Sequence, residues 1–396
     1  MLNLPFRFHL YCKVVDNLGD AGVTWRLARQ LASEHRLEVH LFIDAPDTLA
    51  LIVPNARAGA MLDGVRIEHW DVAAPPRDPG TVIVSAFGCE LPPATRAAIA
   101  SRPGILWINL EYLSAEGWID ECHRLVSRKP SDGAVEHFFY PGFSKASGGL
   151  LREATLLNQR NAFLDEDCAT RWLNELGIGA LPGERRISLF CYPNAPIADW
   201  LSLIAESKRP TRVLVAQGVA SEALQRFSGM HLKPGDRIER GALSLECYAL
   251  LAQPQFDRLL WSCDLNLVRG EDSWVRAIWA GRPFIWQPYQ QADQAHRPKL
   301  EAFLARLTGG DDRTPSLDAA LRDTEHKQAA QAAMAMMRAW DGDGELQQCW
   351  PAYEACLPAI ARLHRQLSDD LSRQPDLCSQ LLAYCQEELS RGDRSG

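Results

Sequence analysis

The sequence predicts an α/β protein with two domains of similar size, followed by a helical C-terminal region. The chain has 396 residues, which is more than one hydrophobic core usually organises. Short segments rich in β-branched and aromatic residues alternate with segments of helical periodicity. This alternation starts again after a cluster of glycine and proline at residues 177–183, which we expect to be a linker. We therefore expect two doubly wound, Rossmann-like domains around a central cleft, at residues 1–178 and 184–370.

The first expected domain opens with a strand at residues 7–15, where apolar and polar side chains alternate. A turn rich in Asp, Asn and Gly follows at residues 16–20 and leads into a helix at about 21–35. Residues 127–149 contain clusters of Gly, Pro and Ser and are expected to be rich in loops. The other elements expected in this domain are strands at residues 37–43, 65–70, 81–87 and 105–110 and a helix at 92–101.

The second expected domain repeats this pattern after a helix at residues 165–176 and the linker. Its expected strands are residues 186–192, 212–217, 264–268 and 283–286, and its expected helices are 195–207, 256–262 and 273–280. Helices are also expected at residues 328–340, 352–366 and 371–391. The last segment, residues 371–396, is a candidate to fold back and complete the first domain.

Composition and charge exclude several classes of protein. Apolar residues make up 46% of the chain and charged residues 23%, which is typical of globular proteins and excludes extensive disorder. The net charge of −8 argues against a nucleic-acid-binding protein that relies on a basic face. The sequence has no run of about eighteen apolar residues, so no membrane span is expected. The N-terminus also lacks the pattern of a signal peptide.

Cysteine spacing indicates free thiols. The chain has eleven cysteines, an odd number, and none of them are in CxxC spacing. Cys349 and Cys356, like Cys378 and Cys385, would lie two helical turns apart, which is too far for a disulfide. We therefore expect buried thiols and a cytoplasmic protein.

The loop after the first strand holds the first candidate site, because ligands of open α/β sheets bind beyond the carboxyl ends of the strands. Asp16 and Asp20 bracket this turn. The two carboxylates could bind a cationic group or act in base catalysis. Alternatively, Asp20 could be the N-cap of the next helix and Asp16 a turn residue. The pattern alone favours this structural role.

The second candidate site lies between the expected strand at 264–268 and the helix after it. Arg269, Ser273 and the N-terminus of that helix suit an anion such as a diphosphate. Glu271 and Asp272 would repel a phosphate but suit sugar hydroxyls or catalysis. A helix start with acidic residues in its first turn explains the same pattern equally well.

Other polar or aromatic residues at strand ends are weaker candidates. Residues 109–112 (Asn-Leu-Glu-Tyr) end a strand, and Phe190 and Tyr192 end another, where an aromatic ring could stack on a base. Residues 109–112 could instead be an ordinary loop, and Phe190 and Tyr192 could belong to the hydrophobic core. No two histidines are four residues apart, so no histidine-based metal site is expected. No P-loop, dinucleotide-binding or nucleophile-elbow motif is present, which argues against a P-loop NTPase, a Rossmann dehydrogenase and an α/β-hydrolase.

Four segments together resemble the elongation factor P arginine rhamnosyltransferases, the EarP family, over about residues 7–300. They are CKVVDNLGDAGVTWRLAR at 12–29, INLEYLSAE at 108–116, FFYPGF at 138–143 and DRLLWSCDLNLVRGEDS at 257–273. The resemblance implies a GT-B glycosyltransferase fold and transfer of rhamnose from dTDP-β-L-rhamnose to an arginine of elongation factor P, with inversion. It implies no cofactor and no metal, and elongation factor P as the protein partner.

The resemblance also implies roles for individual residues. It gives Asp16, Asp20 and Glu271 as the catalytic carboxylates, with Asp20 the general base and Asp16 the group that holds the guanidinium. Glu271 would bind the sugar or stabilise the transition state. The residues implied to bind dTDP-rhamnose are Phe190, Tyr192, Gln255, Arg269, Asp272, Ser273 and Tyr289.

Three other functions remain open on the sequence alone. A different GT-B sugar transferase would act on another acceptor, and a sugar-nucleotide epimerase of similar fold would need no protein acceptor. A non-enzymatic nucleotide-binding or scaffold protein would use the same acidic residues only as caps and turns. The expected carboxylates in both domains favour an enzyme.

Overall fold

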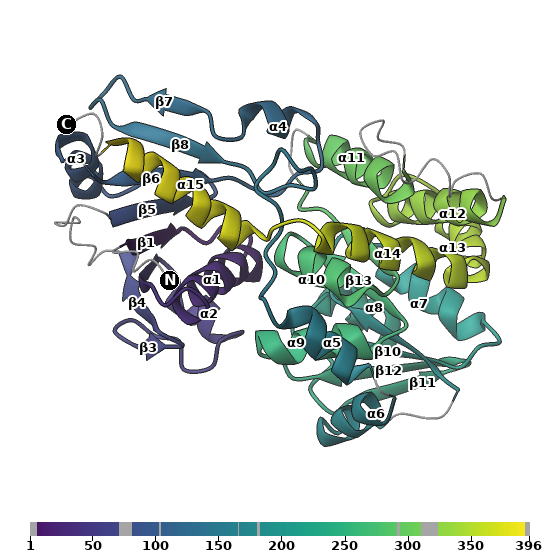
Figure 1. Ribbon diagram of the computed structural model, residues 1–396. Helices are drawn as coiled ribbons and strands as arrows, with labels where there is room; N and C mark the ends of the chain where they lie inside the picture. Colours follow the sequence, from purple (N-terminus) through teal and green to yellow (C-terminus); the bar gives the residue numbers. More distant parts are fainter. Residues whose placement is uncertain are drawn as a thin grey trace. The chain divides into compact units, whose positions relative to one another are not determined.

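The protein folds as two compact α/β units, each built around its own sheet (Figure 1). The structure is a computed structural model, and it describes residues 6–70, 81–102, 104–164, 166–179, 183–290, 294–309 and 324–392. Unit 1 comprises Met1–Ala154 and Gln374–Gly396, and unit 2 comprises Thr155–Arg373. The predicted α/β class is thereby confirmed, whereas the division falls earlier in the chain than the boundary expected at 178–184.

Helices α5 (Leu156–Phe163) and α6 (Glu166–Glu175) account for this earlier division. Phe163 packs edge-on against Trp172 of α6 and against Trp261 of α9 (Gln253–Ser262), with ring centroids 5.8 and 5.6 Å apart. This aromatic cluster joins the two helices to unit 2, although the sequence places them before the glycine-rich linker.

Unit 1 has an eight-stranded sheet in the order β3-β4-β2-β1-β5-β6-β8-β7. Its six inner strands pair in parallel, and the two edge strands pair antiparallel with their neighbours. The strands are β1 Arg7–Cys12, β2 Glu38–Ile43, β3 Met61–Leu62, β4 Val65–His69, β5 Thr81–Ala86, β6 Leu106–Leu110, β7 Val126–Arg128 and β8 Val135–Phe139. The helices are α1 Leu18–Ser33, α2 Pro46–Ala50, α3 Pro93–Ser101, α4 Trp118–Cys122 and α15 Leu377–Gly392.

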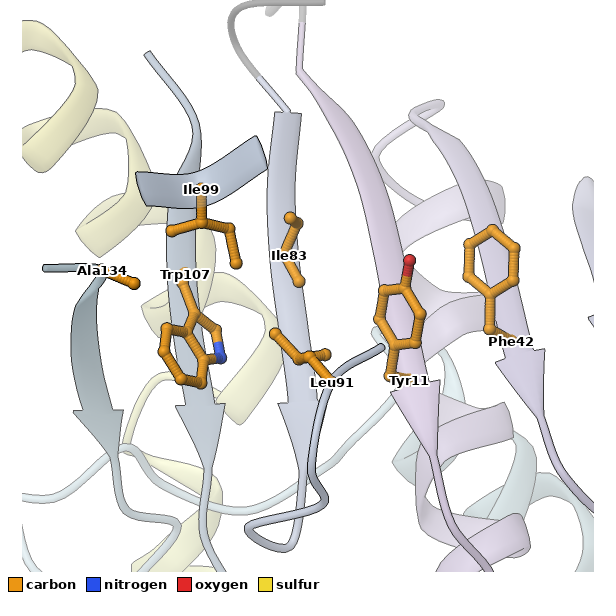
Figure 2. Packing of buried hydrophobic residues seen from close by; sticks show 7 residues of the cluster. All are labelled: Tyr11, Phe42, Ile83, Leu91, Ile99, Trp107 and Ala134. Atoms are coloured by element: carbon orange, nitrogen blue, oxygen red, sulfur yellow. The ribbon is translucent and has the colours of Figure 1, made fainter. Parts of the chain in front are cut away.

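Hydrophobic side chains cover both faces of this sheet. On one face, Tyr11, Phe42, Ile83 and Trp107 belong to one buried cluster, which also includes Ile99 of α3 (Figure 2). The rings of Tyr11 and Phe42 stack 4.8 Å apart, and the Tyr11 hydroxyl lies 3.3 Å from Thr95 Oγ1 of α3. The strands that carry these four residues run in the same direction, so their carboxyl ends share one edge of the sheet.

Residues 127–149 were expected to be rich in loops and to hold no strand, but β8 lies within that range. Its Glu136 and His137 are buried, which obscured the strand in the sequence. Glu136 pairs with Lys129, and the hydroxyl of Tyr384 in α15 lies 2.7 Å from Nδ1 of His137. The partners that allow these polar residues inside the sheet could not be read from the local pattern.

Unit 2 has a six-stranded sheet in the order β11-β12-β10-β9-β13-β14, parallel except for the β11–β12 pair. The strands are β9 Arg185–Leu189, β10 Thr211–Ala216, β11 Arg237–Arg240, β12 Leu243–Tyr248, β13 Leu265–Arg269 and β14 Phe284–Gln287. Besides α5, α6 and α9, the helices are α7 Ile197–Glu206, α8 Ser221–Ser228, α10 Asp272–Ala280, α11 His296–Thr308, α12 Thr324–Trp340, α13 Leu346–Ala355 and α14 Leu357–Ser372.

All eleven cysteines lie in the described part of the chain, and none forms a disulfide there, as expected. Burial raises the pKa of the Cys191 thiol to about 12, so this thiol stays protonated. No helix among the described residues is both long and apolar enough to cross a bilayer.

Candidate functional site

The turn after β1 holds the first group of predicted site residues. Asn17 has a φ of 40°, and the amide of Gly19 donates to the carbonyl of Asp16 at 2.7 Å. This tight turn starts α1 at Leu18, earlier than expected. Asp20 therefore lies inside the first helical turn and is not the residue that caps it.

Asp20 is almost completely buried, with 2% of its surface exposed. Its Oδ2 atom accepts hydrogen bonds from the amides of Val15 and Asp16, both at 2.8 Å. An acidic residue at this position commonly reaches back to amides before the helix. Burial raises the pKa of Asp20, whereas the two amides and a hydrogen bond from Tyr112 oppose that rise. A carboxylate with a raised pKa is a better proton acceptor than an exposed one.

Asp16 is half-buried beside Asp20 in the same turn. A Cβ atom added at Gly19 would lie 2.7 Å from Oδ2 of Asp16. The absence of a side chain at Gly19 thus lets the Asp16 carboxylate lie against the start of α1.

Two further residues lie at the same sheet edge: Asp44, which was not predicted, and Tyr112, which was one of the weaker candidates at residues 109–112. Asp44 directly follows β2, and its Oδ1 atom accepts the amide hydrogen of Val14 at 2.9 Å. Tyr112 follows β6 and hydrogen-bonds to Asp20. The position of Asp44 after an expected strand was the signal that could have identified it.

Arg269, at the end of β13, is the centre of the second group. Its guanidinium carbon lies 4.7 Å from the ring centroid of Phe190 and 4.8 Å from that of Tyr192. Its Nη1 atom donates to the carbonyl of Cys191 at 3.1 Å. The cation is thus held against the residues that follow β9, at the carboxyl end of the sheet of unit 2.

The loop from β13 into α10 carries the predicted anion-binding residues. The Oγ atom of Ser273 accepts the Arg269 amide hydrogen at 3.0 Å and donates to the Arg269 carbonyl. Gly270 has a φ of 59°, a conformation that glycine adopts without strain. Glu271 is half-buried and directly precedes α10, and Asp272 accepts a hydrogen bond from Gln253 Nε2 at 3.4 Å.

The two remaining predicted residues are exposed beside this group. Tyr289 is 46% exposed, and its ring meets that of Tyr192 edge-on, with centroids 5.7 Å apart. Gln255 is exposed in the first turn of α9, where its neighbour Phe256 packs 5.3 Å from Phe190. The structure thus gathers Asp16 and Asp20 in unit 1 and the other predicted residues in unit 2.

Among the described residues, no group of three or more His, Cys, Asp or Glu side chains is arranged to hold a metal ion.

Known proteins match the chain over nearly its full length. The family described as "Elongation-Factor P (EF-P) rhamnosyltransferase EarP" matches residues 8–386. This chain belongs to the EarP family. The predicted family is confirmed, and with it the predicted class of enzyme, a glycosyltransferase.

EarP relatives from Pseudomonas cover almost the whole chain. The protein-arginine rhamnosyltransferase of Pseudomonas putida is 42% identical over 96% of this chain and 98% of its own length. That of Pseudomonas aeruginosa is also 42% identical, over 95% and 97%. A solved structure described as "Structural basis for EarP-mediated arginine glycosylation of translation elongation factor EF-P" is 32% identical, with a TM-score of 0.66, and covers 96% of this chain and 98% of its own.

A buried ion pair supports the helices that carry the unit 2 site. Arg276 of α10 forms two hydrogen bonds to Asp257 of α9, at 2.9 and 2.6 Å. Arg276→Ala should lower the free energy of unfolding by about 3–5 kcal/mol, because it leaves a buried carboxylate without its partner. Urea unfolding measures this loss. Arg338→Ala, which breaks an exposed pair with Glu301, should cost no more than about 1 kcal/mol. Equal losses in the two variants would contradict the assignment.

Proposed function

We propose that this chain transfers rhamnose from dTDP-β-L-rhamnose to an arginine of elongation factor P, with inversion at the anomeric carbon. The observation that carries the proposal is the match to the EarP family over residues 8–386. The names of the Pseudomonas relatives and of the solved EarP structure support arginine as the acceptor group.

Asp20 is proposed as the general base. An arginine guanidinium has a pKa above about 12, so it must lose a proton as its nitrogen bonds to the sugar. The guanidinium nitrogen becomes acidic only as the new C–N bond forms, and a carboxylate can then remove the proton. Two backbone amides fix Oδ2 of Asp20 and hold the group in place. Asp16 is proposed to hold the guanidinium through charge-assisted hydrogen bonds.

The unit 2 group is proposed to bind the donor. Arg269 and the N-terminus of α10, at Asp272 and Ser273, would meet the charge that grows on the departing diphosphate. Phe190 and Tyr192 offer aromatic faces for the thymine, with Gln255 reaching the base and Tyr289 the diphosphate. Glu271 is assigned to the sugar, because it precedes α10 beside the proposed phosphate site.

We further propose that the transfer needs no divalent metal, because Arg269 and the helix N-terminus would supply the positive charge that the diphosphate requires. Full activity is therefore expected after dialysis against excess EDTA. The rate of rhamnose transfer measures this, with and without added Mg²⁺. A rate that falls in EDTA and returns with Mg²⁺ would contradict metal independence.

The dependence of donor cleavage on the acceptor tests the proposed function. Release of dTDP from dTDP-rhamnose should require elongation factor P, because the arginine is the nucleophile. Conversion of the donor without any protein acceptor would favour an epimerase. Release that another acceptor stimulates, but elongation factor P does not, would favour a different sugar transferase.

A further inference from the structure

Two stacked aromatic side chains lie at the sheet edge that holds Asp20. Phe87 directly follows β5 and Tyr112 closely follows β6, and these two strands come next after β1 in the sheet. The ring centroids lie 4.4 Å apart, with an angle of 16° between the ring planes. Both side chains are half-buried, so neither is part of the closed core.

The backbone at Phe87 is in a conformation that bulky residues rarely adopt. Its φ is 59°, a left-handed conformation that is strained for a residue other than glycine. The Phe87 amide donates to the Leu110 carbonyl at 2.6 Å, and the next amide, of Gly88, donates to Asn109 Oδ1 at 3.2 Å. Glycine or asparagine would adopt this backbone conformation with less strain. The presence of an aromatic residue here indicates that its ring contributes to binding or catalysis.

Tyr112 connects this aromatic pair to the proposed base, because its hydroxyl donates a hydrogen bond to the Asp20 carboxylate. The exposed part of the stack therefore lies next to the group that would remove the acceptor proton. A guanidinium is planar and weakly hydrated, and it binds well to an aromatic face with carboxylates at its edge.

On the basis of the proposed function, we infer that the Phe87–Tyr112 pair forms one wall of the site that receives the acceptor guanidinium, and that Tyr112 is a positioning residue for Asp20. The wall would contact the face of the guanidinium, while Asp16 and Asp20 accept hydrogen bonds from its N–H groups. This gives unit 1 a means of selecting a planar cation over an ammonium group.

The titratable groups around Asp20 determine how the pH dependence of kcat should change when the Tyr112 hydroxyl is removed. Asp44 and Cys12 face it from the ends of β2 and β1, Asp16 shares its turn, and Tyr112 approaches from β6. Burial and Asp44 raise the Asp20 pKa, whereas the Tyr112 hydroxyl lowers it. Removing the hydroxyl should therefore raise that pKa further.

Three substitutions test the two parts of the inference separately, each measured by steady-state transfer of rhamnose to elongation factor P. Tyr112→Phe keeps the ring and should move the acid limb of the kcat profile to higher pH, with little change in the acceptor KM. Phe87→Leu keeps apolar bulk but lacks a π face, so it should raise the acceptor KM about threefold to thirtyfold. Phe87→Tyr restores the ring and should return the KM close to its original value. Affinity for dTDP, measured by calorimetry, should remain unchanged in all three variants.

The outcomes distinguish this inference from the proposed function. An unshifted acid limb in Tyr112→Phe would overturn the positioning role. A KM that is unchanged in Phe87→Leu, or that stays raised in Phe87→Tyr, would overturn the wall. If the unaltered protein itself transfers no rhamnose to elongation factor P, the proposed function fails and the guanidinium assignment fails with it.

Discussion

Asp20→Asn should lower kcat for arginine rhamnosylation by about 10²–10⁴-fold, which is the usual contribution of a general base. The asparagine side chain has the shape of the carboxylate, and its oxygen can still accept hydrogen bonds from the backbone amides of Val15 and Asp16. It cannot accept the proton that the guanidinium nitrogen loses. Affinity for dTDP should stay within about twofold, because the residue belongs to the acceptor side of the mechanism.

The same substitution should not destabilise the fold at neutral pH. The pKa of Asp20 is raised in the folded protein, so its contribution to stability is fully present below the ordinary pKa of aspartate. That contribution is lost as the pH rises through the folded-state pKa. At neutral pH the ionised carboxylate therefore stabilises the folded state no more than a neutral amide would. Asp20→Asn should unfold at the same or a higher urea concentration.

A matched control for Asp20→Asn is Asp132→Asn, which removes a charge from a surface pair with Arg96 in the same unit. Its kcat should equal that of the unaltered protein. Normal turnover in Asp20→Asn, measured on a folded sample, would rule out Asp20 as the base.

Arg269→Ala should weaken the binding of dTDP about tenfold to hundredfold, the range for losing one charge-assisted hydrogen bond. The guanidinium lies against the rings of Phe190 and Tyr192, so its loss also removes a contact that orders these two side chains. Calorimetric titration with dTDP measures the effect without the acceptor. Arg269→Lys should recover only part of the affinity, because an ammonium lacks the planar face.

The matched control for Arg269→Ala is Arg258→Ala, which removes an exposed arginine from α9. It changes the net charge by the same amount, so a general electrostatic effect would appear in both variants. Equal affinities in Arg269→Ala and in the unaltered protein would contradict the proposed diphosphate site.

The sequence predicted most of the parallel strands because their apolar pattern is local. Strands β1, β9 and β13 begin within a residue or two of the expected positions. Strands β8 and β12 were missed because each contains a buried acidic residue that breaks the pattern. Glu246 in β12 pairs with Arg212 and Arg237, and Glu136 in β8 pairs with Lys129. The pair of Glu246 with Arg212 joins residues 34 positions apart, and such a pair cannot be read from a window of the sequence.

The candidate site could also be predicted only where its residues follow from the local sequence. Asp16, Asp20 and Arg269 each follow a strand closely, so their position at a sheet edge could be inferred. The contact of Asp20 with Tyr112, and the stack of Tyr112 on Phe87, depend on the strand order β1-β5-β6. That order is a property of the folded sheet, which explains why Tyr112 was only a weak candidate and Phe87 was not a candidate.

Intact-mass spectrometry of elongation factor P tests the central claim most directly. Unmodified elongation factor P is incubated with this protein and dTDP-β-L-rhamnose, beside an acceptor variant in which the target arginine is lysine. We expect the mass of the unaltered acceptor to increase by one deoxyhexose residue and that of the lysine variant to stay the same. No increase in either acceptor, from a protein that still binds dTDP, would contradict the account.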